Sequence, residues 1–344
     1  MNPTPVVSEI DLNADGRHAG FLRLPHSVHR SAYGFIPVPI ISVKRGSGPC
    51  VVLMAGNHGD EYEGQVALAK LARHLDPDTI EGQVIILPAA NTPAVCAGLR
   101  TSPLDEGNLN RSFPGNPRGT PTEIIADYLE RDLFKRADYL LDLHSGGSSL
   151  VYLPTALVDR GHNAVDNRRR LDIVRALGLP WALIFDRDAD GPYATSAVTR
   201  QGGLGLTVEL GGGGAVTPAI LSMIETGLHQ YLAHLGVIKH AGDGLLDSDC
   251  HEEPTLLMIK DDTQYVYART AGVFEPAVEL GVAVRAGQLA GRIHTPETPW
   301  QASAECHFEC DGIVICRRAM ARSLPGDCLF QLGCHLPGDY LIIN

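Results

Sequence analysis

A histidine and a glutamate stand three residues apart in the segment 56–64, which reads GNHGDEYEG. The apolar run 50–55 (CVVLMA) precedes this segment, and apolar residues at helical spacing follow it, so we expect a turn between a buried strand and a helix. From such a turn His58 and Glu61 can reach one ion. A neutral imidazole and a carboxylate are suitable zinc ligands, and catalytic zinc takes three protein ligands and keeps a fourth position open.

His144 is the natural third ligand, because it ends the apolar run 139–143 (YLLDL) and is followed by the sequence Ser-Gly-Gly. A lone His-x-x-Glu is common by chance and is a surface pair in most proteins. The glycine-flanked turn after an apolar strand, together with a histidine at a second strand end, favours a metal site over a surface pair.

The segment 108–115 (NLNRSFPG) places an asparagine next to an arginine. Asn110 offers a neutral hydrogen-bond donor and Arg111 a planar, permanently charged guanidinium. Together they can bind a carboxylate. Arg100 lies in the same predicted loop and could polarise a scissile carbonyl. Taken alone, the pattern is better explained by an arginine that covers a loop.

Glu209 stands near the end of the apolar run 206–210, just before four consecutive glycines. A carboxylate at this point can deprotonate a zinc-bound water and pass the proton to a leaving nitrogen. The glycines permit positive φ angles and a close approach of the backbone to a ligand. The alternative is a flexible turn, with Glu209 only capping the next helix.

Strand-like and helix-like segments alternate around these motifs. The predicted strands are residues 50–55, 84–87, 139–143, 181–185 and 206–210, and the predicted helices are residues 62–74, 120–136 and 218–234. The alternation predicts an α/β fold around a mostly parallel sheet, and functional loops in such folds collect at the carboxyl ends of the strands.

The sequence pattern changes after a polar linker at residues 239–254. Short strands such as 264–268 and 312–316 are separated there by Gly and Pro turns, which is typical of an all-β unit. We therefore predict a catalytic domain at residues 1–245, with a strand lead-in at its N-terminus, and a smaller all-β capping domain at residues 250–344.

Bulk composition narrows the class of protein. The chain has 344 residues, of which 44% are hydrophobic and 20% charged, as in soluble globular proteins. Its net charge is −12 and its basic residues are scattered, which argues against nucleic acid or an anionic membrane as a partner. We recognise no signal peptide and no apolar stretch long enough to span a bilayer, so we expect a cytoplasmic protein with reduced cysteines.

His58, Glu61, Asn110, Arg111, His144 and Glu209, in this order, resemble the succinylglutamate desuccinylase and aspartoacylase family. The resemblance covers residues 36–236 and implies a zinc carboxypeptidase-like fold, with a mixed or mostly parallel sheet flanked by helices and a small barrel-like β domain. It further implies one Zn²⁺ per chain, held by His58, Glu61 and His144. Glu209 would then be the general base and acid, Asn110 and Arg111 would bind the substrate α-carboxylate, and Arg100 would stabilise the oxyanion.

Within this family, four strings are most similar to deacetylases that act on N-α-acetyl-L-2,4-diaminobutyrate in ectoine degradation: GNHGDEYEGQVAL, RTSPLDEGNLNRSFPG, DLHSGG and VELGGGG. Aspartoacylases use an additional arginine for the second carboxylate of their substrate. Arg187 lies in a suitable region, but the segment 186–193 around it (DRDADGPY) is acidic. Asp188 and Tyr193 are therefore candidates for binding a substrate with a side-chain ammonium, and a solvated acidic loop is the equal alternative.

The C-terminal segments 272–288 and 312–329 resemble the two halves of a lipoyl-type barrel. No lysine follows Lys260, which excludes a carrier role for this part and favours a cap over the active-site cleft. Six of the eight cysteines lie from Cys250 onward. A second, structural zinc among them and the nearby histidines would be an alternative to core packing, but their spacings lack the Cys-x-x-Cys form of zinc knuckles.

Three other functions use the same residues. A metallocarboxypeptidase could use the same ligands, although a long peptide needs an open groove and a capping domain favours small substrates. A deacylase for acetylaspartate or succinylglutamate differs only in its substrate pocket. A non-catalytic binding protein should lack the general base, yet Glu209 is present. We expect a small N-acyl amino acid as the main partner and, from symmetry statistics alone, a homodimer.

Overall fold

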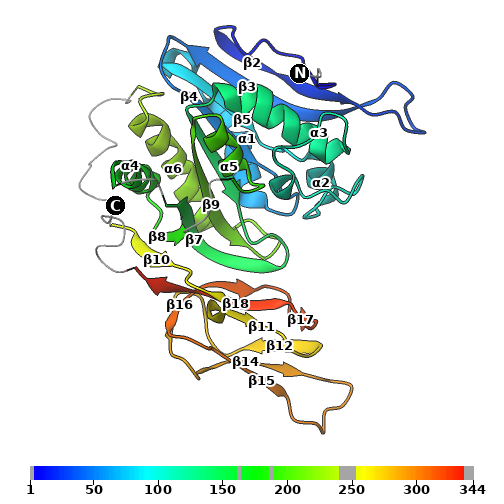
Figure 1. Ribbon diagram of the computed structural model, residues 1–344, viewed down its shortest axis with the longest axis vertical. Helices are drawn as coiled ribbons and strands as arrows, with labels where there is room; N and C mark the ends of the chain where they lie inside the picture. The colour runs from blue at the N-terminus through cyan, green and yellow to red at the C-terminus, as the bar shows by residue number, and fades with distance from the viewer. Residues whose placement is uncertain (1–3, 161–163, 186–189, 240–252, 337–344) are drawn as a thin grey trace.

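The computed structural model describes residues 4–160, 164–185, 190–239 and 253–336. One large sheet runs through the molecule, from the β2–β3 hairpin at one end to the C-terminal strands at the other (Figure 1). The strands of this sheet, in spatial order, are β1 (Val7–Ser8), β2 (Gly16–Pro25), β3 (Phe35–Arg45), β5 (Gly82–Leu87), β4 (Cys50–Ala55), β6 (Tyr139–His144), β9 (Leu204–Gly212), β7 (Leu150–Asp159), β8 (Trp181–Phe185), β10 (Thr255–Met258), β18 (Cys328–His335), β16 (Gly312–Arg318) and β13 (Ala283–Val284), with β11 (Tyr265–Tyr267) paired to β18.

The sheet is mixed, so the prediction of a mostly parallel sheet is not confirmed. Strands β5, β4, β6 and β9 are parallel neighbours, and so are β7, β8 and β10, but β7 runs antiparallel to β9. The physical reason lies between β6 and β7, which are joined by residues 145–149 alone. A parallel crossover needs about a dozen residues or more, so a connection this short reverses the strand direction.

Helices cover both faces of the sheet and bury its strands. Alternate residues of β4 face opposite layers: Val51 and Leu53 pack with α1, α4 and α6, whereas Val52 and Met54 pack with α3 and α5. The helices are α1 (Tyr62–His74), α2 (Thr92–Ala97), α3 (Pro121–Tyr128), α4 (Ala164–Leu177), α5 (Ala194–Arg200) and α6 (Pro218–His234). None of the helices in the described ranges is long and apolar enough to cross a membrane.

The helix predicted at residues 120–136 begins where expected and changes form before it ends. Thr120 and Glu123 make the reciprocal capping box, with Pro121 in the first turn. The α-helical part stops at Tyr128, and the chain continues as a π turn (Leu129–Leu133) and a 3₁₀ turn (Phe134–Arg136). Further 3₁₀ turns occur at Pro77–Thr79, Leu109–Arg111 and Asp262–Gln264.

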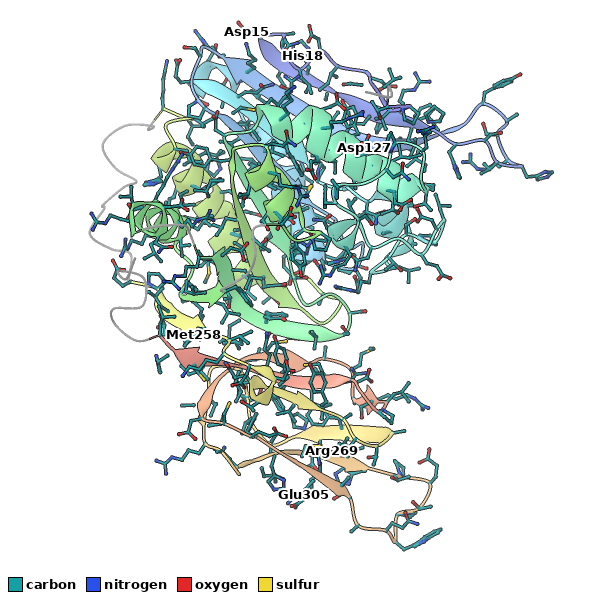
Figure 2. All side chains as sticks on the ribbon, viewed as in Figure 1. Asp15, His18, Asp127, Met258, Arg269 and Glu305 are labelled. Atoms are coloured by element: carbon teal, nitrogen blue, oxygen red, sulfur yellow. The ribbon has the colours of Figure 1, made fainter. Side chains whose placement is uncertain are left out.

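The C-terminal region is β-rich, as predicted, and it continues the main sheet through β10, β18 and β16. A second sheet packs beyond it, in the order β15 (Ala304–His307), β14 (Leu289–His294), β12 (Gly272–Pro276) and β17 (Arg322–Ser323). Figure 2 shows Met258 where the two parts of the molecule meet, with Arg269 and Glu305 farther out. Most of the predicted linker lies outside the described residues.

The parallel strands bring the predicted site residues to one edge of the sheet. Ala55, the last residue of β4, pairs with Leu143 of β6, and His144 pairs with Glu209 of β9. The turn that holds His58 and Glu61 follows β4 directly, so it lies beside His144. This is the carboxyl edge at which the sequence predicted the site.

Gly64 allows α1 to lie close to β6. A Cβ atom at this position would meet the Cβ of Leu143 at 2.6 Å and that of Ala55 at 3.2 Å. The first turn of α1 follows Glu61, and Leu143 precedes His144, so this close contact sets the distance between two predicted ligands. A side chain at position 64 would push the two elements apart.

We expect Gly64→Ala to lower the free energy of unfolding by about 1–3 kcal/mol through overpacking, and also to weaken Zn²⁺ binding. Gly227→Ala in α6 is the matched control, because its Cβ would meet the Leu177 carbonyl oxygen at 2.4 Å, away from the ligands. The control should lose stability and keep its Zn²⁺ affinity. Chemical denaturation and zinc titration measure both quantities, and unchanged affinity in Gly64→Ala would contradict this account.

Candidate metal centre and active site

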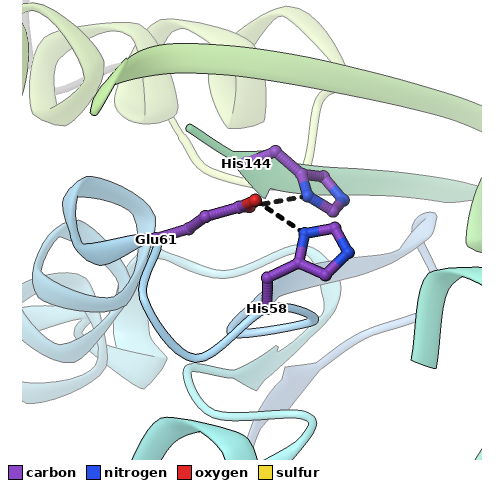
Figure 3. Close-up of side chains that lie close together, drawn as sticks. All are labelled: His58, Glu61 and His144. Atoms are coloured by element: carbon purple, nitrogen blue, oxygen red, sulfur yellow. Dashed lines mark hydrogen bonds and ion pairs between the residues drawn. The ribbon is translucent and has the colours of Figure 1, made fainter. Parts of the chain in front are cut away.

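The three predicted ligands lie together in the structure (Figure 3). Their ligand atoms all lie within 4.8 Å of one another, and each residue is only 3% exposed. The Glu61 carboxylate lies between the two rings, with Oε1 at 2.6 Å from His58 Nδ1 and Oε2 at 2.8 Å from His144 Nδ1. Within the described residues, this is the cluster whose composition and spacing suit a metal ion.

The outer nitrogen of each imidazole has an acceptor. His58 Nε2 lies 3.1 Å from Asn108 Oδ1, and His144 Nε2 lies 2.8 Å from Asp142 Oδ2. With each Nε2–H donating to its acceptor, the Nδ1 atoms carry lone pairs that face the Glu61 oxygens. Lone pairs at such short separations need a cation between them, so the arrangement fits a metal bound through Nδ1 of both rings.

Asp142 is a fully buried carboxylate behind the ligands. Besides the contact with His144, it accepts hydrogen bonds from Asn57 Nδ2 at 2.9 and 2.8 Å. Asp142 and His144 are two residues apart on β6, so their side chains share one face of the strand. Asp142 therefore fixes both the orientation and the tautomer of the His144 ring.

The electrostatics of the cluster favour positive charge. Burial raises the pKa of Glu61, but the neighbouring His144 and His58 outweigh burial and hold that pKa well below its usual range. Burial lowers the pKa of His144, and the carboxylates of Asp142 and Glu61 outweigh it and raise that pKa well above its usual value. Both shifts come from the attraction between the buried carboxylates and the imidazole rings, which favours the charged form of each partner.

Glu209 lies opposite His144 in the β6–β9 ladder and lines the same cavity. Its Oε2 is buried and has no hydrogen-bond partner among the described residues. Burial, with the charge of Glu61 added, raises the pKa of Glu209 to about 8. A carboxyl with a pKa in this range can take and return a proton at neutral pH.

Glu63 holds the glycine loop that follows Glu209. This fully buried residue in the first turn of α1 accepts a hydrogen bond from the Gly212 backbone N–H at 3.2 Å. The four glycines at positions 211–214 all have positive φ, a conformation that other residues rarely adopt. The glycine run is therefore an ordered loop tied to α1, and Glu209 does not cap the next helix, which has Thr217 at its N-cap.

Arg100 lies over the ligand cluster from the open side. Its Nη1 atom lies 3.4 Å from His58 Nδ1 and 3.5 Å from Glu61 Oε1. The side chain is 52% exposed, so a substrate can reach the guanidinium from the cavity.

Asn110 and Arg111 meet the cavity in different ways. Asn110 Nδ2 lies 3.2 Å from His144 Nε2, and Asn110 Oδ1 accepts from the Ala194 backbone N–H at 2.9 Å. The Arg111 guanidinium lies over the ring of Tyr193, 4.8 Å from its centroid. An aromatic ring under a planar guanidinium limits its orientations, and Arg111 Nη1 also donates to the Asn110 carbonyl oxygen at 2.8 Å.

Eight of the nine predicted site residues line one cavity of about 580 Å³. The ninth, Asp188, lies outside the described residues. The eight are His58, Glu61, Arg100, Asn110, Arg111, His144, Tyr193 and Glu209. Tyr265 and Gln331 of the C-terminal region also line this cavity. They are linked to each other, since Gln331 Nε2 donates to Tyr265 Oη at 2.9 Å and Gln331 Oε1 accepts from Tyr152 Oη at 3.0 Å.

The sequence analysis missed several residues that support the site. Asn57 and Asn108 flank motifs that had been identified, and Asp142 could have been found from its strand position two residues before His144. Tyr265 and Gln331 carry no local signal, because only the tertiary fold brings the C-terminal strands to the cavity. Of the C-terminal cysteines, Cys306 and Cys316 are buried in hydrophobic clusters of the β-rich region.

We expect Asp142→Asn to weaken Zn²⁺ affinity by about 10- to 100-fold, because the His144 ring loses the carboxylate that orients it. Asp138→Asn is the matched control, since Asp138 lies just before the same strand and accepts from the Cys50 N–H at 2.8 Å, away from the ligands. Competition with a chelator of known affinity measures both variants. Equal affinities for Asp142→Asn and the unmodified protein would show that Asp142 does not support the site.

Comparisons with known proteins agree with this geometry. Residues 47–235 match the catalytic domain of the succinylglutamate desuccinylase/aspartoacylase family. An N-alpha-acetyl-L-2,4-diaminobutyric acid deacetylase from Halomonas elongata is 42% identical over 329 residues, which are 95% of this chain and 94% of the relative.

Two solved structures have the same fold over nearly the whole chain. The product-bound ectoine utilization protein EutE (DoeB) from Ruegeria pomeroyi has a TM-score of 0.90 at 37% identity, covering 97% of this chain and 100% of that one. A succinylglutamate desuccinylase/aspartoacylase from Rhodobacter sphaeroides has a TM-score of 0.89 at 36% identity, with the same coverage of 97% and 100%. The motifs, the arrangement of the site and these similarities lead to one conclusion: the chain belongs to the succinylglutamate desuccinylase/aspartoacylase family.

Proposed function

We propose that this protein hydrolyses the amide of N-α-acetyl-L-2,4-diaminobutyrate to acetate and L-2,4-diaminobutyrate, with one Zn²⁺ held by His58, Glu61 and His144. The observation that carries the proposal is the Glu209 carboxyl, which lies opposite His144, has a buried Oε2 atom and has a pKa raised to about 8. The choice of substrate is supported by the Halomonas elongata deacetylase, which is similar over 95% of the chain.

Two imidazole nitrogens and one carboxylate are a donor set that suits zinc. When bound, the ion would supply Lewis acidity and lower the pKa of a water molecule towards neutrality. Asp142 and Asn108 would hold the two rings with Nδ1 facing that ion, through the contacts at 2.8 and 3.1 Å. The burial of all three ligands would keep bulk water from competing with them.

Glu209 would move the proton in both halves of the reaction. As a carboxylate it would take a proton from the attacking water, and as a carboxylic acid it would give that proton to the nitrogen of the leaving amine. Its buried Oε2 atom has no hydrogen-bond partner among the described residues, so no described hydrogen bond would compete with a proton for this oxygen. A buried carboxyl with a pKa of about 8 holds the proton firmly enough to deliver it to the amine.

The arginines would bind the negative charges of the substrate and of the transition state. Arg100 lies next to the ligand atoms and would stabilise the oxygen of the acyl carbonyl as it becomes negative, an effect commonly worth about 3–4 kcal/mol. Arg111, oriented by Tyr193, would bind the α-carboxylate together with Asn110. Together these contacts would hold the scissile amide between Glu209 and the ligand cluster.

The shape of the cavity favours this reaction over peptide cleavage. Tyr265 and Gln331 of the C-terminal region close one side of the cavity, where a peptidase would need an open groove for the rest of its substrate. The proposal that residues 250–344 act as a capping domain rests on the same two side chains. A non-catalytic binding protein would have no need of a buried carboxyl opposite the ligands.

We expect Glu209→Gln to lower the kcat for acetate release from N-α-acetyl-L-2,4-diaminobutyrate by about 10²- to 10⁴-fold while Zn²⁺ remains bound. Glu225→Gln, which removes a surface carboxylate paired with Lys70, is the matched control and should keep full activity. An acetate assay and metal analysis measure the two effects.

Acetylaspartate, succinylglutamate and a blocked dipeptide should be run in the same assay. Turnover of either acyl amino acid without turnover of the diaminobutyrate derivative would keep the deacylase and replace the substrate. Cleavage of the dipeptide alone would establish a peptidase, and full activity of Glu209→Gln would remove the proposed general base.

A further inference from the structure

Three carboxylates of the described residues line the cavity, and the chemistry proposed above uses only two of them. Glu61 has both of its oxygens on the imidazole rings, and Glu209 lies opposite His144 as the proton carrier. Asp159 is the third, and it is the last residue of β7. It lies within the cavity wall but has no part in holding the metal or moving the proton.

The strand register places Asp159 at a defined distance from Glu209. Thr155 of β7 pairs with Glu209, and Leu157 pairs with Thr207. Alternate residues of a strand share a face, so Thr155, Leu157 and Asp159 face the same side as Glu209. Asp159 is four residues beyond Thr155, which puts it about 13 Å along the sheet from Glu209 at roughly 3.3 Å per residue.

The end of the cavity at Asp159 has an aromatic wall. Asp159 pairs with Phe185 in the parallel β7–β8 ladder, and both side chains line the cavity. A carboxylate next to an aromatic ring is a combination that binds a primary ammonium, through charge-assisted hydrogen bonds and cation–π attraction. Between Asp159 and Glu209 the wall is formed by Leu157 and Thr207, which suits a short methylene chain.

Among the described residues that line the cavity, the charged side chains differ between its two ends. Arg100 and Arg111 lie on the side of the ligand cluster, and Asp159 lies at the far end of β7. A substrate with a carboxylate at one end and an ammonium at the other would match this distribution, whereas a second carboxylate on its side chain would meet Asp159 and be repelled.

We propose that Asp159 is the residue that selects a substrate with a short side-chain ammonium, which it binds next to the ring of Phe185. This inference rests on the proposed function and identifies the residue that recognises the side chain of the substrate. In the extended diaminobutyryl group, the α-nitrogen and the side-chain nitrogen are about 5 Å apart across four bonds. Hydrogen bonds of about 2.8 Å at each end extend this span to about 10–11 Å, which leaves about 2–3 Å of the separation along the sheet to the side chains of Glu209 and Asp159.

The test compares two substrates of the same shape, one charged and one neutral, on the same protein. N-α-acetyl-L-2,4-diaminobutyrate carries the ammonium, and N-acetyl-L-norvaline has a methyl group in its place. We expect the unmodified protein to prefer the charged substrate by about 100-fold in kcat/KM, as for a desolvated charge pair. Asp159→Asn should lose this preference through a higher KM for the charged substrate, and its activity on acetylnorvaline should stay the same.

Acetylnorvaline hydrolysis is the internal control for folding, because it needs the ligands, Glu209 and both arginines but not Asp159. Asp159→Glu is the second variant, and it should keep the preference for the charged substrate because it keeps the carboxylate. Equal losses on both substrates in Asp159→Asn, or an unchanged KM for the charged one, would overturn the assignment of Asp159.

The substrate preference of the unmodified protein tests the inference without any substitution. Equal kcat/KM values on the two substrates would exclude a residue that recognises the substrate ammonium. Failure to release acetate from the charged substrate, with turnover of acetylaspartate, would instead overturn the proposed function. The failure of the subsite and the failure of the function therefore give different results.

Discussion

The Glu61 carboxylate between two imidazole rings is the interaction on which the rest of the site depends. A buried carboxylate is costly unless charge and hydrogen bonds compensate it, and here the compensation is positive charge held between Glu61, His58 and His144, which lie on separate elements. The turn after β4 and the end of β6 must therefore stay in contact. Parallel pairing of β4 with β6, and the close approach of α1 to Leu143 at Gly64, maintain that contact.

The same edge of the sheet supplies the group that moves protons. Glu209 follows from β9 pairing with β6, so its position relative to His144 is set by the ladder and not by a loop. Low dielectric surroundings then raise its pKa, because the charged form loses its hydration. The position of Glu209 and its raised pKa thus have one cause, because the carboxyl ends of the central strands are buried. The cavity beyond them extends along β7 to Asp159 and is also lined by Tyr265 and Gln331 of the C-terminal region.

The sequence was most informative where a motif adjoined a strand. His58, Glu61, His144 and Glu209 could each be placed, because a buried apolar run ends just before or at the residue. The strand direction of β7 could not be predicted from the alternation of strands and helices, since it depends on the short connection at residues 145–149. The contacts of Tyr265 and Gln331 with the cavity could not be predicted either. They arise from β18 joining the main sheet beside β10, a pairing between residues far apart in the chain.

The proposed site holds one metal ion through Nδ1 of both histidines and the carboxylate of Glu61. Anomalous diffraction at the zinc edge, from crystals of the zinc-loaded protein, locates that ion. We expect a single peak per chain, about 2.0–2.2 Å from His58 Nδ1, His144 Nδ1 and a Glu61 oxygen. A peak at the Nε2 atoms or at the C-terminal cysteines, or no peak at this cluster in excess zinc, would contradict it.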